Sequence, residues 1–197
     1  MREYSEKELV IFGGVLKLAQ TGAPLSEITA RRIADAAGIG KATIYDYFSS
    51  KEEILVHALV YTMQQQIDAT RARLDKIDGF KGKIMFIYND IIDKMENSMS
   101  LFSVLASMGT PDKIHTIFRE NGHCRMVTDI VHQIEFTLKA VINHGRNTGE
   151  ITCMDRDYTY MTVTAAIFSV GRLATEKKLP REIICENAYT MLTKALN

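Results

Sequence analysis

The chain has 197 residues and a mass of 22.2 kDa, enough for one or two domains at roughly 100–200 residues each. Apolar residues make up 46% and charged residues 24%, close to a soluble globular average, which excludes wholesale disorder. Lysine plus arginine and aspartate plus glutamate both number 24, so the net charge is zero. Any nucleic-acid binding must therefore be argued from local placement of charge rather than from bulk basicity.

The sequence favours a reducing compartment. Three cysteines without a C-x-x-C pair do not form a disulfide framework. The first residues carry mixed charge, and no cleavage-like ending follows them. The apolar stretch 161–171 is about half of the ~20 residues that a membrane-spanning helix needs. We therefore expect a cytoplasmic protein without a membrane partner.

Apolar residues recur at three- and four-residue spacing along most of the chain, which is typical of amphipathic helices. In the first part of the chain this pattern predicts helices over 5–21, 29–37, 41–48 and 50–75. A capping box formed by Ser50 and Glu53 opens the last of these. The pair Asp78-Gly79 predicts a break between two regions.

Four or five further helices are predicted after residue 80. One apolar stripe runs from Ile84 to Met99, and a second lies on a helix over about 124–144. A glycine-containing turn at 145–149 ends that helix, and two helices follow at about 155–177 and 181–196. No segment alternates with period two, so we predict an all-α fold of about nine helices.

The segment 28–48 predicts two short helices joined by a tight turn at Gly38, the form of a helix-turn-helix. Ile44 and Phe48 are four residues apart and share the buried face of the second helix. The opposite side, here called the reading face, consists of Ala42, Thr43 and Asp46, with Tyr45 and Tyr47 on its flanks. Free N–H groups near Thr29 and Lys51 mark helix N-termini that attract phosphate.

The pattern I-T-x-x-x-I-A-x-x-A-G-I-x-x-x-T-I-Y-x-Y-F-x-x-K-E-x-I, which begins at residue 28, resembles the TetR family of transcriptional repressors. The resemblance implies a three-helix DNA-binding domain over 1–52 and a helical regulatory domain over 53–197. It implies a homodimer on a palindromic operator in double-stranded DNA, which a small-molecule effector releases, with no cofactor. The DNA-binding residues it implies, completed by the reading face, are Thr29, Arg31 or Arg32 as alternatives, Lys41, Ala42, Thr43, Tyr45, Asp46, Tyr47 and Lys51.

Two residues depart from the family's usual pattern. Gly40 stands where Ser or Thr commonly caps the recognition helix, which weakens the cap by roughly a few tenths of a kcal/mol. Asp46 places a negative charge at the centre of the reading face. Its carboxylate either accepts a hydrogen bond from cytosine N4 or only tempers binding as a solvated acid, and both interpretations stay open. Residues 1–52 hold seven basic and seven acidic residues, so we expect modest non-specific affinity.

Ten methionines and several aromatic residues predict a core that also suits an adaptable apolar ligand pocket. We expect a hydrophobic effector. The candidate lining residues are Met85, Tyr88, Met95, Met99, Phe102, Met108, Phe118, Phe136 and Met161.

The last two helices are the predicted dimer surface, with intramolecular packing as the competing account. The candidates combine small residues with apolar area: Ala165, Ala166, Ser169, Tyr189 and Leu192. Because the recognition helices of a dimer must meet successive major grooves about 34–36 Å apart, the dimer geometry decides DNA binding.

Other functions have weaker support in the sequence. His115, His123, Cys124, His132 and Cys153 match no compact zinc pattern, so we expect no metal. Enzyme motifs are missing, and the one Glu-x-x-His, at Glu120, contains an Asn-Gly turn, so we expect no enzyme. The alternative to a DNA-binding regulator is a helical small-molecule sensor with weak or vestigial DNA binding.

Overall fold

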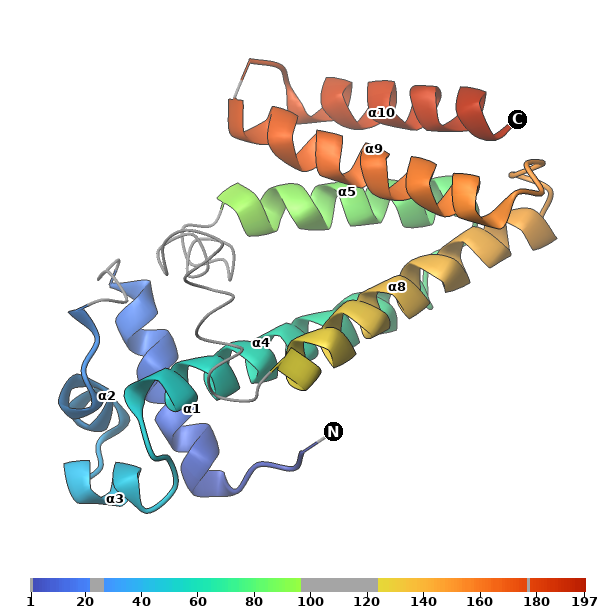
Figure 1. Cartoon of the computed structure of the whole chain (residues 1–197). Coiled ribbons are helices and arrows are strands. Elements are labelled where there is room, and N and C mark those ends of the chain that lie inside the picture. The colour runs from blue at the N-terminus through green and yellow to red at the C-terminus, as the bar shows by residue number, and fades with distance from the viewer. Residues whose placement is uncertain (1, 22–26, 97–123, 177) are drawn as a thin grey trace. The chain divides into compact units, whose positions relative to one another are not determined.

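The computed structural model describes residues 2–21, 27–96, 124–176 and 178–197, and these contain eight helices and no strand (Figure 1). The all-α fold predicted from the sequence is confirmed. In chain order the helices are α1 (Glu6–Gln20), α2 (Ala30–Ala37), α3 (Lys41–Tyr45), α4 (Lys51–Leu74), α5 (Phe80–Glu96), α8 (Cys124–Asn147), α9 (Arg156–Glu176) and α10 (Arg181–Leu196).

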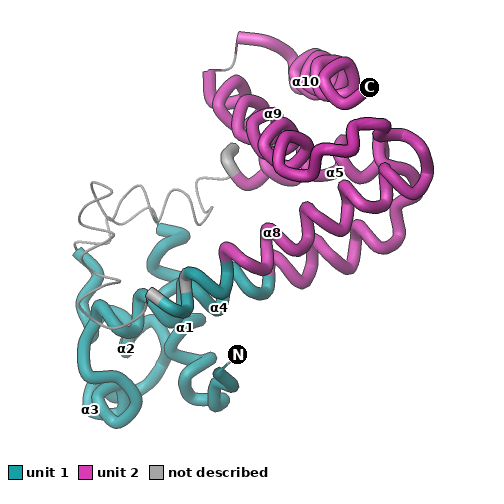
Figure 2. Tube along the Cα trace, turned by 45° about the vertical axis from the view of Figure 1, so that its right-hand side comes forward, with its two compact units in different colours: residues 1–65, 98–130 teal, residues 66–97, 131–197 magenta. Residues whose placement is uncertain are grey.

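The chain divides into two compact units, coloured separately in Figure 2. Unit 1 comprises residues 1–65 and 98–130, and unit 2 comprises residues 66–97 and 131–197. Both α4 and α8 contribute residues to each unit. The predicted division into domains 1–52 and 53–197 stays a prediction.

The core of unit 1 holds the first three helices together with the start of α4. Ile11, Ile33, Ile44 and Ile54 are each 0% exposed, one from each of these helices. Gly14 allows α1 and α2 to approach closely, because a Cβ atom at this position would lie 2.7 Å from the Ile33 carbonyl oxygen. The buried branched side chains therefore fix the helix-turn-helix on a packed support.

Helix α3 ends at Tyr45, so the predicted helix over 41–48 is three residues too long. The backbone N–H groups of Tyr47 and Phe48 both donate to the Ile44 carbonyl, at 3.1 and 3.0 Å. A turn thus replaces the last predicted helical residues, yet it still brings Phe48 onto the buried side with Ile44. The four-residue spacing of Ile44 and Phe48 does not by itself distinguish a continued helix from this turn.

Side chains cap the helices of unit 1 largely as predicted. The Thr29 hydroxyl accepts from Arg32 N–H, and Gly38 ends α2 in the left-handed conformation at φ 70°. The Ser50 hydroxyl accepts from Glu53 N–H at 3.1 Å, whereas the Glu53 carboxylate binds Ser49. As predicted, Gly40 gives α3 no side-chain cap.

The core of unit 2 consists of the apolar sides of α5, α9 and α10 with parts of α4 and α8. α9 lies between α5 and α10 (Figure 1), and it packs against both. The predicted stripe on α5 is buried where it is described, since Ile84, Tyr88 and Ile92 are 0% exposed.

Helix α8 continues through Asn147, and so the turn predicted at 145–149 begins too early. Gly145 lies inside the helix, where a Cβ atom would approach the Phe80 ring to 2.8 Å. Gly149, with a φ of 75°, is the residue that ends the chain reversal. Gly145 therefore serves close packing rather than termination.

Glu150 caps the N-terminus of α5 from a distant part of the chain. Its carboxylate accepts hydrogen bonds from Phe80 N–H at 2.7 Å, Lys81 N–H at 3.3 Å and the Thr148 hydroxyl at 2.9 Å. Burial acts to raise the pKa of the Glu150 carboxyl group, but these hydrogen bonds and nearby His144 outweigh it and hold that pKa below its ordinary value. The ionised form is therefore the one that stabilises unit 2.

Glu150→Gln is expected to lower the free energy of unfolding by about 1 kcal/mol at neutral pH, because it removes a charged helix cap. A depressed pKa stabilises the fold above the unfolded-state pKa of about 4.3, and this contribution is lost as the pH falls through the folded-state value. Urea unfolding of both proteins should show the difference at neutral pH and a smaller difference in acid. A difference that grows in acid would contradict the assignment.

Candidate nucleic-acid interface

The reading face predicted from the sequence lies on the outside of unit 1. Ile44 and Phe48 are 0% and 2% exposed, whereas Tyr45 and Tyr47 are 52% and 38% exposed. Asp46 lies exposed between the two tyrosines. The two phenol groups and the carboxylate are thus accessible to a partner, whereas Ile44 and Phe48, which anchor this segment, are buried.

The remaining residues of the reading face are also accessible. Ala42 is exposed and Thr43 is half-buried. The Lys41 ammonium lies 5.8 Å from the centre of the Tyr45 ring, a cation–π distance. Lys41 and Tyr45 therefore form one surface element with a positive charge above an aromatic ring.

The structure separates Arg31 from Arg32, which the sequence left as alternatives. The Arg32 guanidinium donates to the Glu27 carbonyl at 3.1 Å and lies 3.9 Å from the Glu27 carboxylate. Arg31 is exposed, and it has no hydrogen bond or ion pair to the described residues. Lys51 is half-buried and lies 3.7 Å from the Glu52 carboxylate. Arg31 is therefore the cation of this group with the fewest competing contacts.

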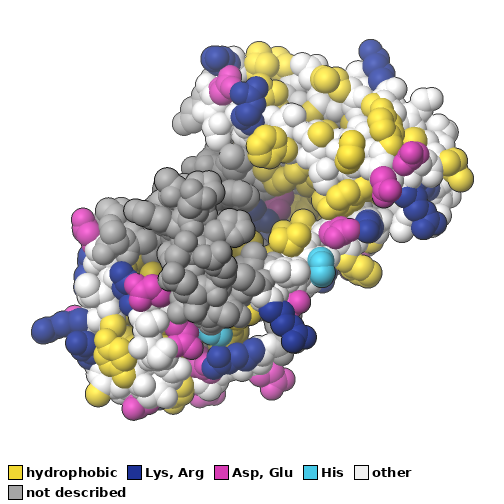
Figure 3. Space-filling model, viewed as in Figure 1, with side chains coloured by type: hydrophobic (Ala, Val, Ile, Leu, Met, Phe, Trp, Pro, Cys, Tyr) yellow, Lys and Arg dark blue, Asp and Glu magenta, His cyan; other side chains and the backbone are white. Residues whose placement is uncertain are grey.

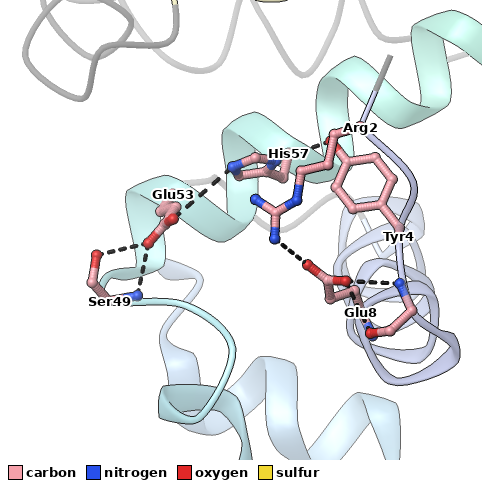
Figure 4. Close-up of polar contacts among 7 residues, drawn as sticks. Arg2, Tyr4, Glu8, Ser49, Glu53 and His57 are labelled. Carbon is pink, nitrogen blue, oxygen red and sulfur yellow. Dashed lines mark hydrogen bonds and ion pairs between the residues drawn. The ribbon is translucent and has the colours of Figure 1, made fainter.

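A series of polar contacts through buried His57 connects the N-terminal segment with the turn after α3 (Figure 4). His57 on α4 is 3% exposed, and its Nδ1 atom lies 2.9 Å from the Tyr4 hydroxyl. Its Nε2 atom lies 4.0 Å from a Glu53 carboxylate oxygen. Glu53 accepts hydrogen bonds from the backbone N–H and the hydroxyl of Ser49, both at 2.7 Å. Since Ser49 follows the reading face directly, these contacts hold the turn in place.

The N-terminal segment is itself fixed by Glu8, which is 5% exposed. Burial acts to raise the pKa of the Glu8 carboxyl group, but hydrogen bonds from Ser5 and the Arg2 guanidinium, 2.6 Å away, hold that pKa below its ordinary value. Sequence reasoning missed this capping box. The signal was the S-x-x-E spacing of Ser5 and Glu8, the same pattern that predicted the start of α4.

The predicted pocket residues are only partly described. Met85 is half-buried against the core of unit 2, and Tyr88 is fully buried with no hydrogen-bond partner for its hydroxyl among the described residues. Phe136 and Met161 are 70% and 65% exposed. The other candidates lie outside the residues whose side chains are described: Met95, Met99, Phe102, Met108 and Phe118. The pocket stays a prediction.

The predicted dimer residues fall into two groups. Leu192 is 1% exposed within the core of unit 2, and Ala166 and Tyr189 pack against that core, which is the competing account. Ala165 and Ser169 are exposed. Sequence reasoning did not assign the large apolar side chains beside them to the dimer surface: Tyr158, Met161 and Phe168 are 45%, 65% and 75% exposed. Hydrophobic side chains are frequent on the face of unit 2 that Figure 3 shows.

Within the described ranges, His, Cys, Asp and Glu side chains form no cluster of three that suits a metal ion. Of the metal candidates, His115 and His123 and the side chain of Cys124 are outside the description. None of the helices searched there is long and apolar enough to cross a membrane.

α2 and α3, joined at Gly38, form a helix-turn-helix, an arrangement that many DNA-binding proteins use. Residues 23–58, which contain α2, α3 and the start of α4, match the family model of bacterial regulatory proteins, tetR family. The resemblance predicted from the sequence is thereby confirmed for this segment, which is similar to the DNA-binding part of the TetR family.

Solved structures share the fold over nearly the whole chain. The fatty acid degradation regulator FadR from Bacillus halodurans matches at 15% identity with a TM-score of 0.66, over 98% of this chain and 97% of that one. FadR from Bacillus subtilis in complex with stearoyl-CoA matches at 16% identity with a TM-score of 0.65, over 96% of this chain and 99% of that one. A TetR transcription regulator from Haloarcula marismortui matches at 20% identity with a TM-score of 0.67, over 98% of this chain and 97% of that one. At such identities the likeness shows the fold alone. A search of curated protein sequences found no match.

Proposed function

We propose that the chain is a dimeric repressor, released from a palindromic operator by a small hydrophobic effector in the cytoplasm. The observation that carries the proposal is the outward position of Tyr45, Asp46 and Tyr47 above the buried pair Ile44 and Phe48. Tyrosine hydroxyls on the flanks of a recognition helix reach phosphates, while the residues between them reach base edges. DNA binding is therefore the function that this face supports best.

The proposed dimer surface is an apolar stripe on α9 formed by Tyr158, Met161, Ala165 and Phe168. These residues are spaced by three, four and three positions, so they lie on one face of the helix. On α10, Ile183 and Met191 are also exposed, at 45% and 73%. Exposed apolar side chains gathered in this way mark interaction surfaces, and small Ala165 allows close approach of a second helix. A second copy of this chain is the proposed partner.

Apolar side chains on α8 support an apolar effector. Val131 and Ile134 are 54% and 41% exposed, although they follow the same helical face as buried Ile130 and Leu138. The FadR structure that contains stearoyl-CoA shows that a regulator of this fold can bind a molecule with a long acyl chain. We propose the same broad class, an apolar chain-bearing molecule, as the effector here.

Gel-shift titration of the purified protein against the DNA upstream of its own gene, at several salt concentrations, tests the proposal. We expect a specific complex whose affinity falls with salt and with added effector. Binding that is equally weak for all DNA sequences at every salt concentration would support the alternative, a helical sensor with vestigial DNA binding.

Asp46→Asn is expected to change the preferred base at one operator position, if the carboxylate accepts a hydrogen bond from cytosine. Selection of binding sites from a random DNA pool measures this preference for both proteins. The discrimination at that position should shift by about tenfold, since a good base contact contributes about 1–3 kcal/mol. Uniformly tighter binding without a changed base would leave Asp46 as a solvated acid.

A further inference from the structure

Arg71 lies on α4 on the same side as two buried apolar side chains. Ile67 and Leu74, four residues before it and three after it, are 9% and 4% exposed. Arg71 itself is half-buried. A charged side chain is costly in such a position unless it is paired, so its partners decide what it does.

The partners of Arg71 are neutral. Its Nε atom donates to the Thr137 hydroxyl at 2.7 Å, and one terminal nitrogen donates to the Gln133 carbonyl at 2.7 Å. The Thr137 hydroxyl donates to the same carbonyl at 2.8 Å, which leaves its lone pair free to accept from Arg71. Two bonds to α8 thus fix the orientation of the guanidinium group without neutralising its charge.

Two acidic side chains of the neighbouring helices, Asp90 of α5 and Glu135 of α8, are already paired. Lys94 binds Asp90 at 2.5 Å, and Thr70 donates to the same carboxylate at 3.2 Å. Lys139 binds Glu135 on α8 at 2.6 Å. In the part of the chain that is described, no carboxylate lies within ion-pair distance of Arg71. Its second terminal nitrogen has no hydrogen-bond acceptor there either.

An oriented guanidinium group with unused N–H donors suits a carboxylate or a phosphate, because its planar fork matches two acceptor oxygens. The Phe136 ring, 70% exposed, has its centre 5.7 Å from the guanidinium carbon. The cation therefore has an aromatic ring beside it at a cation–π distance.

We propose that Arg71 binds the anionic group, a carboxylate or a phosphate, of an amphipathic effector. The inference rests on the proposed function, because it adds a charged end to the apolar molecule proposed there. The positively charged group and the apolar side chains then recognise opposite ends of one ligand.

Three twelve-carbon amphiphiles that differ only in their head group test this assignment: dodecanoate, dodecyl phosphate and dodecanol. Isothermal titration calorimetry of the full chain measures the affinity for each. We expect at least one of the anions to bind about ten- to a hundredfold more tightly than the alcohol. The tighter of the two anions identifies the head group as carboxylate or phosphate.

Arg71→Gln should reduce the affinity for the anions to that for dodecanol and leave dodecanol binding unchanged. The affinity of Arg71→Lys for the anions should lie between these values, because lysine keeps the charge but lacks the planar guanidinium group. Arg73→Gln is the matched control, because Arg73 lies two residues away on α4 and is exposed. Thermal unfolding checks that each variant is folded.

Equal affinity for all three amphiphiles, no binding of any, or an equal loss for all three in Arg71→Gln would overturn the anion site. The last result would identify Arg71 as a tie between α4 and α8 only. A gel shift in the presence of each amphiphile separates this inference from the proposed function. Anion binding that never releases DNA would refute the effector role and leave the anion site intact. Release of DNA by the alcohol as readily as by the anions would support an apolar effector and refute the anion site.

Discussion

Phe168→Glu is expected to convert the protein to a monomer and to lower its operator affinity at least about a hundredfold. Phe168 is 75% exposed and occupies the end of the α9 stripe, so a single chain loses little when it is replaced. In a dimer the new carboxylate would be buried without a partner, which costs several kcal/mol. A monomer offers one recognition helix and loses the gain from binding two half-sites at once.

Light scattering on a size-exclusion column measures the mass of this variant, and a gel shift measures its DNA binding. Met154→Glu is the matched control, because Met154 is 84% exposed but lies in the connection before α9, outside the stripe. The control should stay dimeric and bind DNA. Phe168→Glu that remains dimeric would place the interface elsewhere on the chain.

Phe48→Ala is expected to lower the free energy of unfolding by about 3–5 kcal/mol, because it leaves a cavity in the core of unit 1. Phe48 is 2% exposed, and its ring centre lies 5.8 Å from that of Phe12 and 5.8 Å from that of His57. A loss of this size is a large share of the 5–15 kcal/mol that stabilises a typical domain. DNA binding should weaken with it, since the turn after α3 depends on this ring.

Tyr47→Ala, one residue earlier, separates stability from recognition. Tyr47 is 38% exposed, so its loss should change the stability by less than about 0.5 kcal/mol. Its operator affinity should fall about fivefold, by a similar factor for every DNA sequence, as expected for a phosphate contact. Urea unfolding and gel shifts on both variants check the pair. Phe48→Ala with unchanged stability, or a base-selective loss in Tyr47→Ala, would contradict the assigned roles.

The parts of the fold that the sequence predicts well depend on local chemistry. Thr29 and Gly38 bound α2 because a hydroxyl cap and a left-handed glycine act within a few residues. The failures depend on distant contacts. Gly145 has the composition of a helix terminator, but the Phe80 ring packs against it from another helix and the helix continues.

The same distinction applies to the candidate site. The exposure of Tyr45 follows from helical geometry around Ile44 and was predictable. Tyr47 is exposed as predicted, but it lies in the turn after α3. The choice between Arg31 and Arg32 was not, because it depends on where Glu27 lies. Nor was the contact between Tyr4 and His57, whose residues are 53 positions apart in the chain.

That contact has a consequence for handling the protein. The Tyr4 ring stands edge-on to Phe12 and His57, with ring centres 4.9 and 5.7 Å apart, and so covers them from outside the first helix. A shortened version that starts at α1 would uncover this aromatic group and remove the phenol partner of His57.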